Sequence, residues 1–267
     1  KSDILRLDDD HKVYWKDNPI AYISPGKNYL NPKLELLIDD TIDLESKEKL
    51  KINLNKKLNS LIATELNDLF KLSESKFKNN YVRALCYQLF ENNGVIKREV
   101  VDQTLKKISK EDRVSLRKAG VKIGRYNVFL PKMLKPEAVN LRVKLWKLYY
   151  PKDNKNVVPK FGLNFLKDEI ESNKKFLLIC GFENFNKFYI RVDILERLFL
   201  KIIENTKDRI FKVDSDMINL IGCSKENFYK LLKLMHYVPK KVSDSKGEFF
   251  TYEPKHKKIK KVHKKYN

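Results

Sequence analysis

Acidic side chains gather at two places near the N-terminus, where they raise the question of metal-dependent hydrolysis. Three consecutive aspartates occupy residues 8–10, and three more lie within 39–43. Paired carboxylates can hold the divalent ions that nucleases use. Glu-x-Lys triplets at Glu45 and Glu253 have the spacing of some nuclease sites, but such triplets arise by chance in a chain so rich in lysine and glutamate. We interpret these acids as turn and helix-start residues rather than as a metal site.

Motifs for nucleotide, metal or nucleophilic chemistry are not found. Gly26-Lys27 lacks both the earlier glycine and the following Ser or Thr of a phosphate-binding loop, and there is no DExD/H box. The four histidines contain no His-x-x-x-His pair. Cys86, Cys180 and Cys223 never form a Cys-x-x-Cys pair, which argues against a zinc ribbon and favours a reducing, cytoplasmic compartment. We expect no enzyme activity, metal or cofactor in this chain alone.

Basic and aromatic side chains are the stronger candidates, because cations neutralise phosphates and aromatic rings stack on bases. The segment 120–131, GVKIGRYNVFLP, and the residues after it carry a first group: Lys122, Arg125, Tyr126, Lys132 and Lys135. Arginine is scarce in this chain, and its planar guanidinium can hold a phosphate through two hydrogen bonds. The alternative is structural: the two glycines permit a tight turn, and the aromatic residues belong to the core.

Two further basic groups lie near the C-terminus. One helix face and the hairpin after it carry Tyr229, Lys230, Lys233, Lys240, Lys241 and Lys246. The last stretch, 255–265, has seven lysines in eleven residues, among them Lys257, Lys258, Lys260 and Lys261. Each group has an ordinary alternative: a solvated helix face, a winged helix that binds protein, or a tail that only aids solubility.

The hydrophobic period predicts the elements that position these residues. Strands at 12–15 and 20–23 flank the turn 16–19, and a third strand is expected at 34–38. The period becomes helical from Ser46, with an apolar stripe that continues to Leu69. Later helices are predicted at 76–92, 98–108 and 110–118.

The second half of the chain begins with an extended segment, 120–131, and a helix from about Pro136. This helix is apolar on two faces, so it should pack between two bodies. After a polar linker at 151–159, helices are expected at 194–202, at 214–221 and from Ser224, followed by two strands around 243–247. Three helices and a hairpin are typical of a winged helix. No internal repeat is detected.

Composition sets the frame for these elements. The 267 residues are 42% hydrophobic, so a mainly α, α+β fold with a true core is expected. The predicted division is 1–44 with the hairpin, 45–183 as a helical body, 184–254 as a winged-helix-like domain and 255–267 as a disordered basic tail. The net charge of +21 indicates a polyanionic partner, nucleic acid before any other. No apolar run is long enough to span a membrane.

Several stretches resemble one family. Residues 120–136, GVKIGRYNVFLPKMLKP, are similar to the "GVRFGRY…FLP…LKP" signature of alphaproteobacterial Suv-three-type superfamily-two helicases. Residues 13–23 look like its "W.G.PVA" hairpin, although Asp17-Asn18-Pro19 replaces the usual glycine. Residues 180–198 look like its "GFR…RVDMLERL", and 220–224 like its "LVGCS". The resemblance covers the family's C-terminal region, and the chain does not begin with methionine, so we expect a piece of a longer protein.

The resemblance implies an ATP-dependent RNA helicase as parent, with ATP and magnesium bound by motor domains that this chain lacks. Our first hypothesis is an accessory region that binds nucleic acid, RNA before DNA. The second is a docking module, in which the two-faced helix 137–150 packs on the motor domains or on an RNA-decay nuclease. The third is a free-standing winged-helix DNA-binding regulator, and a nuclease is a fourth.

Overall fold

The computed structural model of the chain describes residues 5–37, 42–74, 77–153, 155–167, 173–241 and 247–254. The predicted basic tail lies outside the described residues, and so does Lys246; the tail lysines concerned are Lys257, Lys258, Lys260 and Lys261. Within the described ranges the fold is α+β with helices predominating, as predicted. None of its helices is both long and apolar enough to cross a membrane.

The N-terminal segment forms a four-stranded antiparallel sheet in the order β1-β2-β3-β4. Its strands are β1 (Leu5–Leu7), β2 (Lys12–Trp15), β3 (Asn18–Asn28) and β4 (Asn31–Leu36). The predicted hairpin is confirmed, but its loop is only Lys16-Asp17, because Trp15 already pairs with Asn18. Lys16 has a φ of 55°, and positive φ is the conformation that two-residue hairpin loops require.

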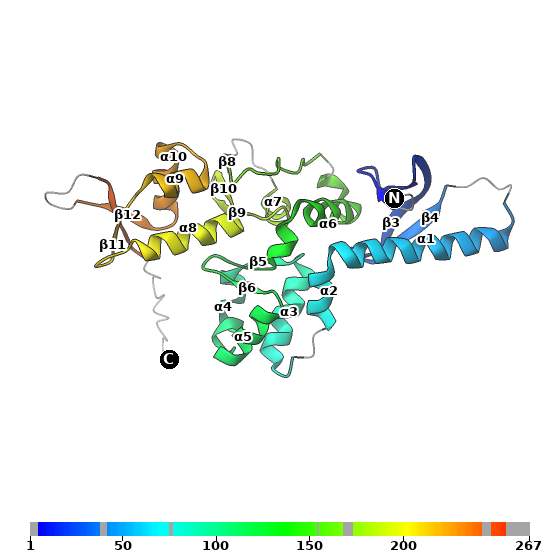
Figure 1. Cartoon of the computed structure of the whole chain (residues 1–267), viewed down its shortest axis with the longest axis horizontal. Coiled ribbons are helices and arrows are strands. Elements are labelled where there is room, and N and C mark those ends of the chain that lie inside the picture. The colour runs from blue at the N-terminus through cyan, green and yellow to red at the C-terminus, as the bar shows by residue number, and fades with distance from the viewer. Residues whose placement is uncertain are drawn as a thin grey trace, which may run out of the picture.

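The predicted helical stripe is divided in two. Helix α1 (Leu44–Glu65) ends at Leu66, and α2 (Asn67–Glu74) follows directly. Asp43 caps α1 by accepting a hydrogen bond from the Ser46 amide at 2.8 Å. Helix α1 lies along the sheet (Figure 1), and the two share one hydrophobic cluster with the helices that follow. Among the described residues, the sheet β1–β4 therefore has no hydrophobic core separate from that of the helices.

Residues 80–129 form a compact unit that we call unit A. It consists of α3 (Asn80–Glu91), β5 (Val95–Lys97), α4 (Arg98–Lys106), α5 (Lys110–Lys118), β6 (Lys122–Ile123) and β7 (Asn127–Phe129). The last strand is central, since the antiparallel sheet has the order β5-β7-β6. This is a winged-helix arrangement: a helix, a strand, two helices and a hairpin, with the last strand in the middle of the sheet.

Residues 192–252 repeat this arrangement as unit C. The elements are α8 (Val192–Glu204), β11 (Ile210–Lys212), α9 (Ser215–Ile221), α10 (Lys225–Leu234), β12 (Tyr237–Lys240) and β13 (Phe249–Tyr252). The sheet order, β11-β13-β12, again has the last strand in the middle. The winged helix predicted here is confirmed, and β11 is an additional strand. The predicted boundary at 184 falls inside a strand of the preceding sheet, and the elements of unit C begin at Val192.

The region between them, unit B, has the same strand order. After a 3-10 helix, η1 (Pro131–Leu134), it contains α6 (Pro136–Tyr149), η2 (Pro151–Asp153), β8 (Phe165–Lys167), α7 (Lys174–Ile179), β9 (Phe182–Phe185) and β10 (Phe188–Arg191). Its sheet order is β8-β10-β9. Helix α6 is buried on both predicted faces: Leu141 and Leu145 join the cluster of unit A, whereas Val143 and Trp146 pack against α7 and β9.

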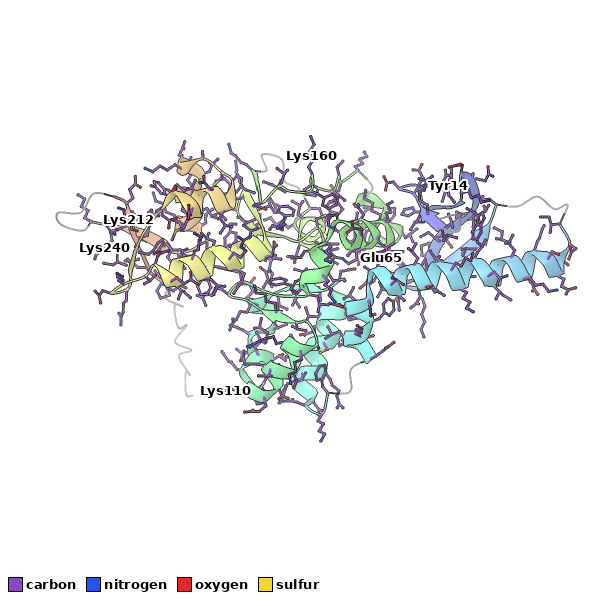
Figure 2. All side chains as sticks on the ribbon, viewed as in Figure 1. Tyr14, Glu65, Lys110, Lys160, Lys212 and Lys240 are labelled. Atoms are coloured by element: carbon purple, nitrogen blue, oxygen red, sulfur yellow. The ribbon has the colours of Figure 1, made fainter. Side chains whose placement is uncertain are left out.

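Three consecutive segments thus share a sheet order, with the last strand in the middle, that their sequences do not reveal; unit B differs in having one described helix, α7, between its first two strands. In Figure 1, unit C lies at the end opposite α1, unit B lies between them, and α3 to α5 of unit A project to one side. Lysines line the outside of the whole molecule, as Lys110, Lys160, Lys212 and Lys240 illustrate in Figure 2. Lysine position alone therefore does not define a binding face.

Candidate nucleic-acid interface

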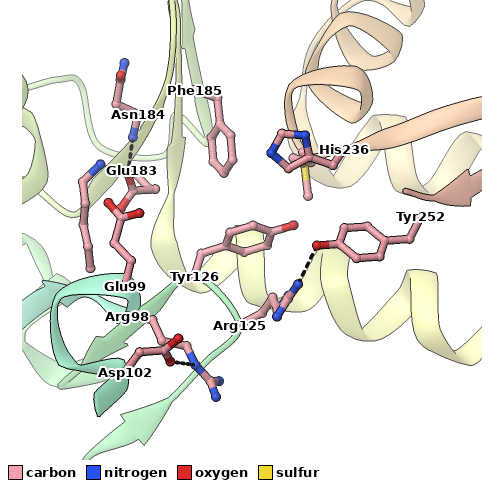
Figure 3. Close-up of a pocket in the computed structure, with 12 residues that line it drawn as sticks. Arg98, Glu99, Asp102, Arg125, Tyr126, Glu183, Asn184, Phe185, His236 and Tyr252 are labelled. Atoms are coloured by element: carbon pink, nitrogen blue, oxygen red, sulfur yellow. Dashed lines mark hydrogen bonds and ion pairs between the residues drawn. The ribbon is translucent and has the colours of Figure 1, made fainter. Parts of the chain in front are cut away.

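The loop between β6 and β7 lies where the three units meet (Figure 3). In a winged helix this loop is the wing, and here it is Gly124-Arg125-Tyr126. The Gly124 amide donates to the Asn127 carbonyl at 2.8 Å, which closes the turn. Arg98, the first residue of α4, donates from its Nη1 to the Gly124 carbonyl at 2.7 Å. The wing is therefore held by its own unit before it contacts the others.

Unit C holds the wing through Glu196 of α8. The Glu196 carboxylate accepts a hydrogen bond from the Arg125 amide at 2.7 Å, and only 8% of the residue is exposed. A Cβ atom at Gly124 would lie 2.4 Å from Glu196 Oε2, so this approach requires glycine. The Arg125 guanidinium donates to the Tyr252 hydroxyl at 3.0 Å, as Figure 3 shows.

Unit B contacts the same segment through Glu183 of β9. The Asn127 amide group donates to Glu183 Oε2 at 2.7 Å, and the Lys97 ammonium lies 2.6 Å from Glu183 Oε1. Tyr126 packs edge-on against Phe185 at 5.5 Å between ring centres. Burial raises the pKa of the Tyr126 hydroxyl. The glycines thus serve the backbone, since Gly124 lies in the turn and Gly120 has a φ of 90°. Tyr126 packs against the core of unit C.

Three hollows run past this junction. The α5 hollow, about 520 Å³, lies between α5 and β6 and is lined by Arg98, Arg113, Arg117 and Lys122. The junction hollow, about 460 Å³, is lined by Arg98 and Arg125 among others. The aromatic hollow in unit C, about 590 Å³, is lined by Arg125, Arg209 and several rings.

Neighbouring hollows share an arginine, so the three hollows adjoin one another in a row. Arg98 lines both the α5 hollow and the junction hollow, and Arg125 lines both the junction hollow and the aromatic hollow. We call the five arginines along this row the arginine track: Arg117, Arg113, Arg98, Arg125 and Arg209. The sequence contains only ten arginines, so half of them lie on the track.

Charge is compensated unequally along the track. In the junction hollow, Asp102 lies 3.3 Å from Arg98, and Glu183 is already paired with Lys97. None of the residues that line the α5 hollow is acidic. There Arg113 donates to the Leu105 carbonyl at 2.6 Å, while Arg117 is exposed. The α5 hollow is therefore the most favourable place on the track for an anion.

The first predicted group is only partly brought together. Lys122 lines the α5 hollow, with its ammonium 5.9 Å from the centre of the Phe129 ring, and Arg125 lies on the track. Lys132 instead forms an ion pair with Asp68 of α2 at 3.0 Å. Lys135 is exposed at the start of α6. Tyr126 lines the junction hollow beside Arg125, so the expected cluster of five is reduced to three members.

The second predicted group lies on unit C, away from the residues that line the track. Tyr229 is half-buried, with its ring 5.5 Å from Phe250, and Lys230 forms an ion pair with Glu226. Lys225, on the same helix, pairs with Glu248 at 3.3 Å. Three of the predicted lysines are exposed and form no ion pair with another described residue: Lys233, Lys240 and Lys241. The expected recognition face of α10 is therefore partly neutralised.

Four track residues were missed by sequence reasoning: Arg98, Arg113, Arg117 and Arg209. The scarcity of arginine could have indicated these residues as well as Arg125. Arg113 and Arg117 lie four residues apart, and so on one face of a helix that was predicted correctly. What sequence could not supply was the pairing of β6 with β7, which places that face beside a strand.

Comparison with family models, with curated proteins and with solved structures finds no match. Among the residues that the structure describes, no three His, Cys, Asp or Glu side chains gather as they would around a metal ion. The candidate site therefore rests on the geometry of the arginine track.

Proposed function

We propose that this chain binds single-stranded nucleic acid, RNA before DNA, along the arginine track, as the C-terminal accessory region of an ATP-dependent RNA helicase. The observation that carries the binding proposal is that the three hollows adjoin one another, share Arg98 and Arg125 and collect half of the chain's arginines. A guanidinium holds a phosphate in a fixed geometry, so a row of them suits a repeating phosphate backbone.

A single strand suits this path better than a duplex. The track passes from unit A to unit C, and a flexible strand can follow such a basic surface with its bases turned toward aromatic rings. The net charge of +21 adds attraction that does not depend on sequence. The preference for RNA rests on the resemblance to the helicase family, as does the parent enzyme.

In this proposal the chain holds the strand as it enters or leaves the motor. ATP and magnesium belong to the motor domains, so the chain itself needs no cofactor. Its own contribution is to keep the strand in one position while the motor moves.

The alternatives have less support. The docking hypothesis used the second apolar face of α6, but Trp146 is only 3% exposed and its ring lies 4.3 Å from Tyr150 within the chain. The DNA-regulator hypothesis uses the face of α10, where Glu226 and Glu248 pair with the lysines. Neither observation favours those functions over the arginine track.

Binding can be tested by fluorescence anisotropy with a labelled single-stranded RNA and the matching DNA from low to moderate salt. Each phosphate contact contributes about 0.7 to the slope of log affinity against log salt concentration for a single strand. We expect Arg117→Gln to weaken binding at every sequence and to reduce the slope by roughly one such contact.

Lys160→Gln is the matched control, because Lys160 is exposed and does not line the track. This substitution removes one positive charge, as Arg117→Gln does. Equal weakening by the two variants would exclude the track as the binding path. Absence of binding at low salt would exclude the proposed function altogether.

A further inference from the structure

The aromatic hollow differs in character from the rest of the track. Its floor is apolar, formed by Phe211 and Tyr237, which are 2% and 5% exposed. Its rim carries apolar groups that water reaches: Tyr252 is 41% exposed and Ile203 is 52% exposed. A phosphate has nothing to gain from such a surface, whereas a flat apolar ring does.

Cations stand at the edges of this hollow. Arg125 lies on the side that adjoins the junction hollow, and Arg209 is a second, exposed lining residue. An apolar floor between two arginines is complementary to a nucleotide, which has an apolar face and an anionic backbone. An apolar peptide would gain nothing from the two arginines.

The principal ring is held in place before any ligand arrives. Tyr252 lies on β13, its ring packs edge-on against Tyr237 at 5.5 Å, and its hydroxyl accepts the hydrogen bond from Arg125. The Arg125 guanidinium carbon lies 5.6 Å from the centre of the Tyr252 ring and 5.8 Å from that of Phe199. A ring that is already fixed loses little conformational entropy when a ligand stacks on it.

We infer that the aromatic hollow binds a nucleobase of the strand, stacked on Tyr252 and flanked by Arg125 and Arg209. Its volume of about 590 Å³ lies within the range of small-molecule pockets. This inference rests on the proposed function, since the strand reaches the hollow along the arginine track. It adds that part of the affinity comes from bases, so that part of the affinity persists when salt screens the phosphates.

The test compares two strands of one length on the full chain: an oligouridylate, and the same sugar-phosphate backbone with abasic positions in its middle. We expect the chain to bind the base-bearing strand about tenfold more tightly, the change produced by loss of one stacked base. Tyr252→Thr should remove this preference, while its affinity for the abasic strand should match that of Tyr252→Phe, because both variants lose the phenol hydroxyl that accepts from Arg125. Tyr252→Phe keeps the ring and should keep the preference.

Tyr87→Thr is the control for loss of an exposed tyrosine, because Tyr87 is 65% exposed on α3 and does not line the hollow. A 2-aminopurine in the strand supplies a second measurement: its fluorescence should be quenched by the wild-type chain and not by Tyr252→Thr. Equal affinity of the wild-type chain for both strands would overturn the inference and leave the proposed function standing. Failure to bind either strand at low salt would overturn both. The two-strand comparison uses no variant, so it can overturn the inference even if Tyr252→Thr does not fold.

Discussion

At the scale of single residues, Arg142 departs most from what its type predicts. It is completely buried on α6, and its partners are backbone carbonyls: Nη1 donates to Asn93 at 2.7 Å, and Nη2 donates to Met133. Burial lowers the pKa of the Arg142 guanidinium to about 10, so it stays charged at neutral pH. Through these two hydrogen bonds, the Arg142 side chain connects the turn before β5 to η1. The helical period predicted α6 and its two faces, but it gave Arg142 no role, because burial depends on which segments meet there.

Arg142→Met should therefore destabilise the chain. Methionine fills most of the space but donates nothing, so two buried carbonyls lose their partner, and we expect a loss of about 3 kcal/mol in the free energy of unfolding. Urea denaturation measures the change. Arg83→Met, on the exposed side of α3, should stay within about 0.5 kcal/mol of the wild type. Similar losses for both variants would show that the two carbonyls do not depend on Arg142.

At the scale of elements, prediction succeeded where the local sequence of a segment determines its secondary structure. The hairpin β2–β3, the helices α4 and α5 and the winged helix of unit C follow from period, turns and caps. Unit A was not recognised, although its helices and extended segment were all predicted. Its strands β5 and β6 have three and two residues, too few to show alternation. Their pairing with β7 depends on tertiary packing, and so the wing and the hollows beside it were not predictable.

Gly124→Ala tests how closely the wing approaches α8. The new Cβ would lie 2.4 Å from Glu196 Oε2, so the carboxylate must move off the Arg125 amide. We expect a loss of about 2 kcal/mol in the free energy of unfolding, typical of an overpacked contact. In a Glu196→Ala background the same substitution should cost clearly less, because the clashing atoms are gone. Additive costs in the double variant would mean that Glu196 is not what excludes a side chain at Gly124.

At the scale of the whole molecule, three units share a topology but do not share one core. The cluster of unit C around Leu198, Phe228 and Phe250 also takes in β10 of unit B, whereas unit A shares its cluster with the N-terminal sheet and α1. A small cluster of Val95, Phe129 and Val192 lies where unit C begins. The expected domain boundary at residue 45 rests on the change in hydrophobic period from strand to helix. Such a change marks where the secondary structure changes, but it does not mark where one hydrophobic core ends and another begins.

Native-state hydrogen exchange should reflect these cores. Amides of α1 and α3 should exchange through one common opening, since both helices bury side chains in the same cluster. Amides of α8 and α10 should exchange through a different opening with its own free energy. One free energy common to all four helices would mean that the units unfold only together.

The position of the wing in the sequence also orders events during synthesis. Each three-stranded sheet closes within its own segment, so the sheet of unit A can form as soon as residue 129 has left the ribosome, before α6 completes its hydrophobic cluster. The partners of Arg125, however, are synthesised much later. Glu196, which accepts from the Arg125 amide, lies 71 residues further along the chain, and Tyr252, which accepts from its guanidinium, lies 127 residues further. The sheet of unit A can thus form before its contacts with unit C, and the proposed path for the strand is completed only when Tyr252 reaches Arg125.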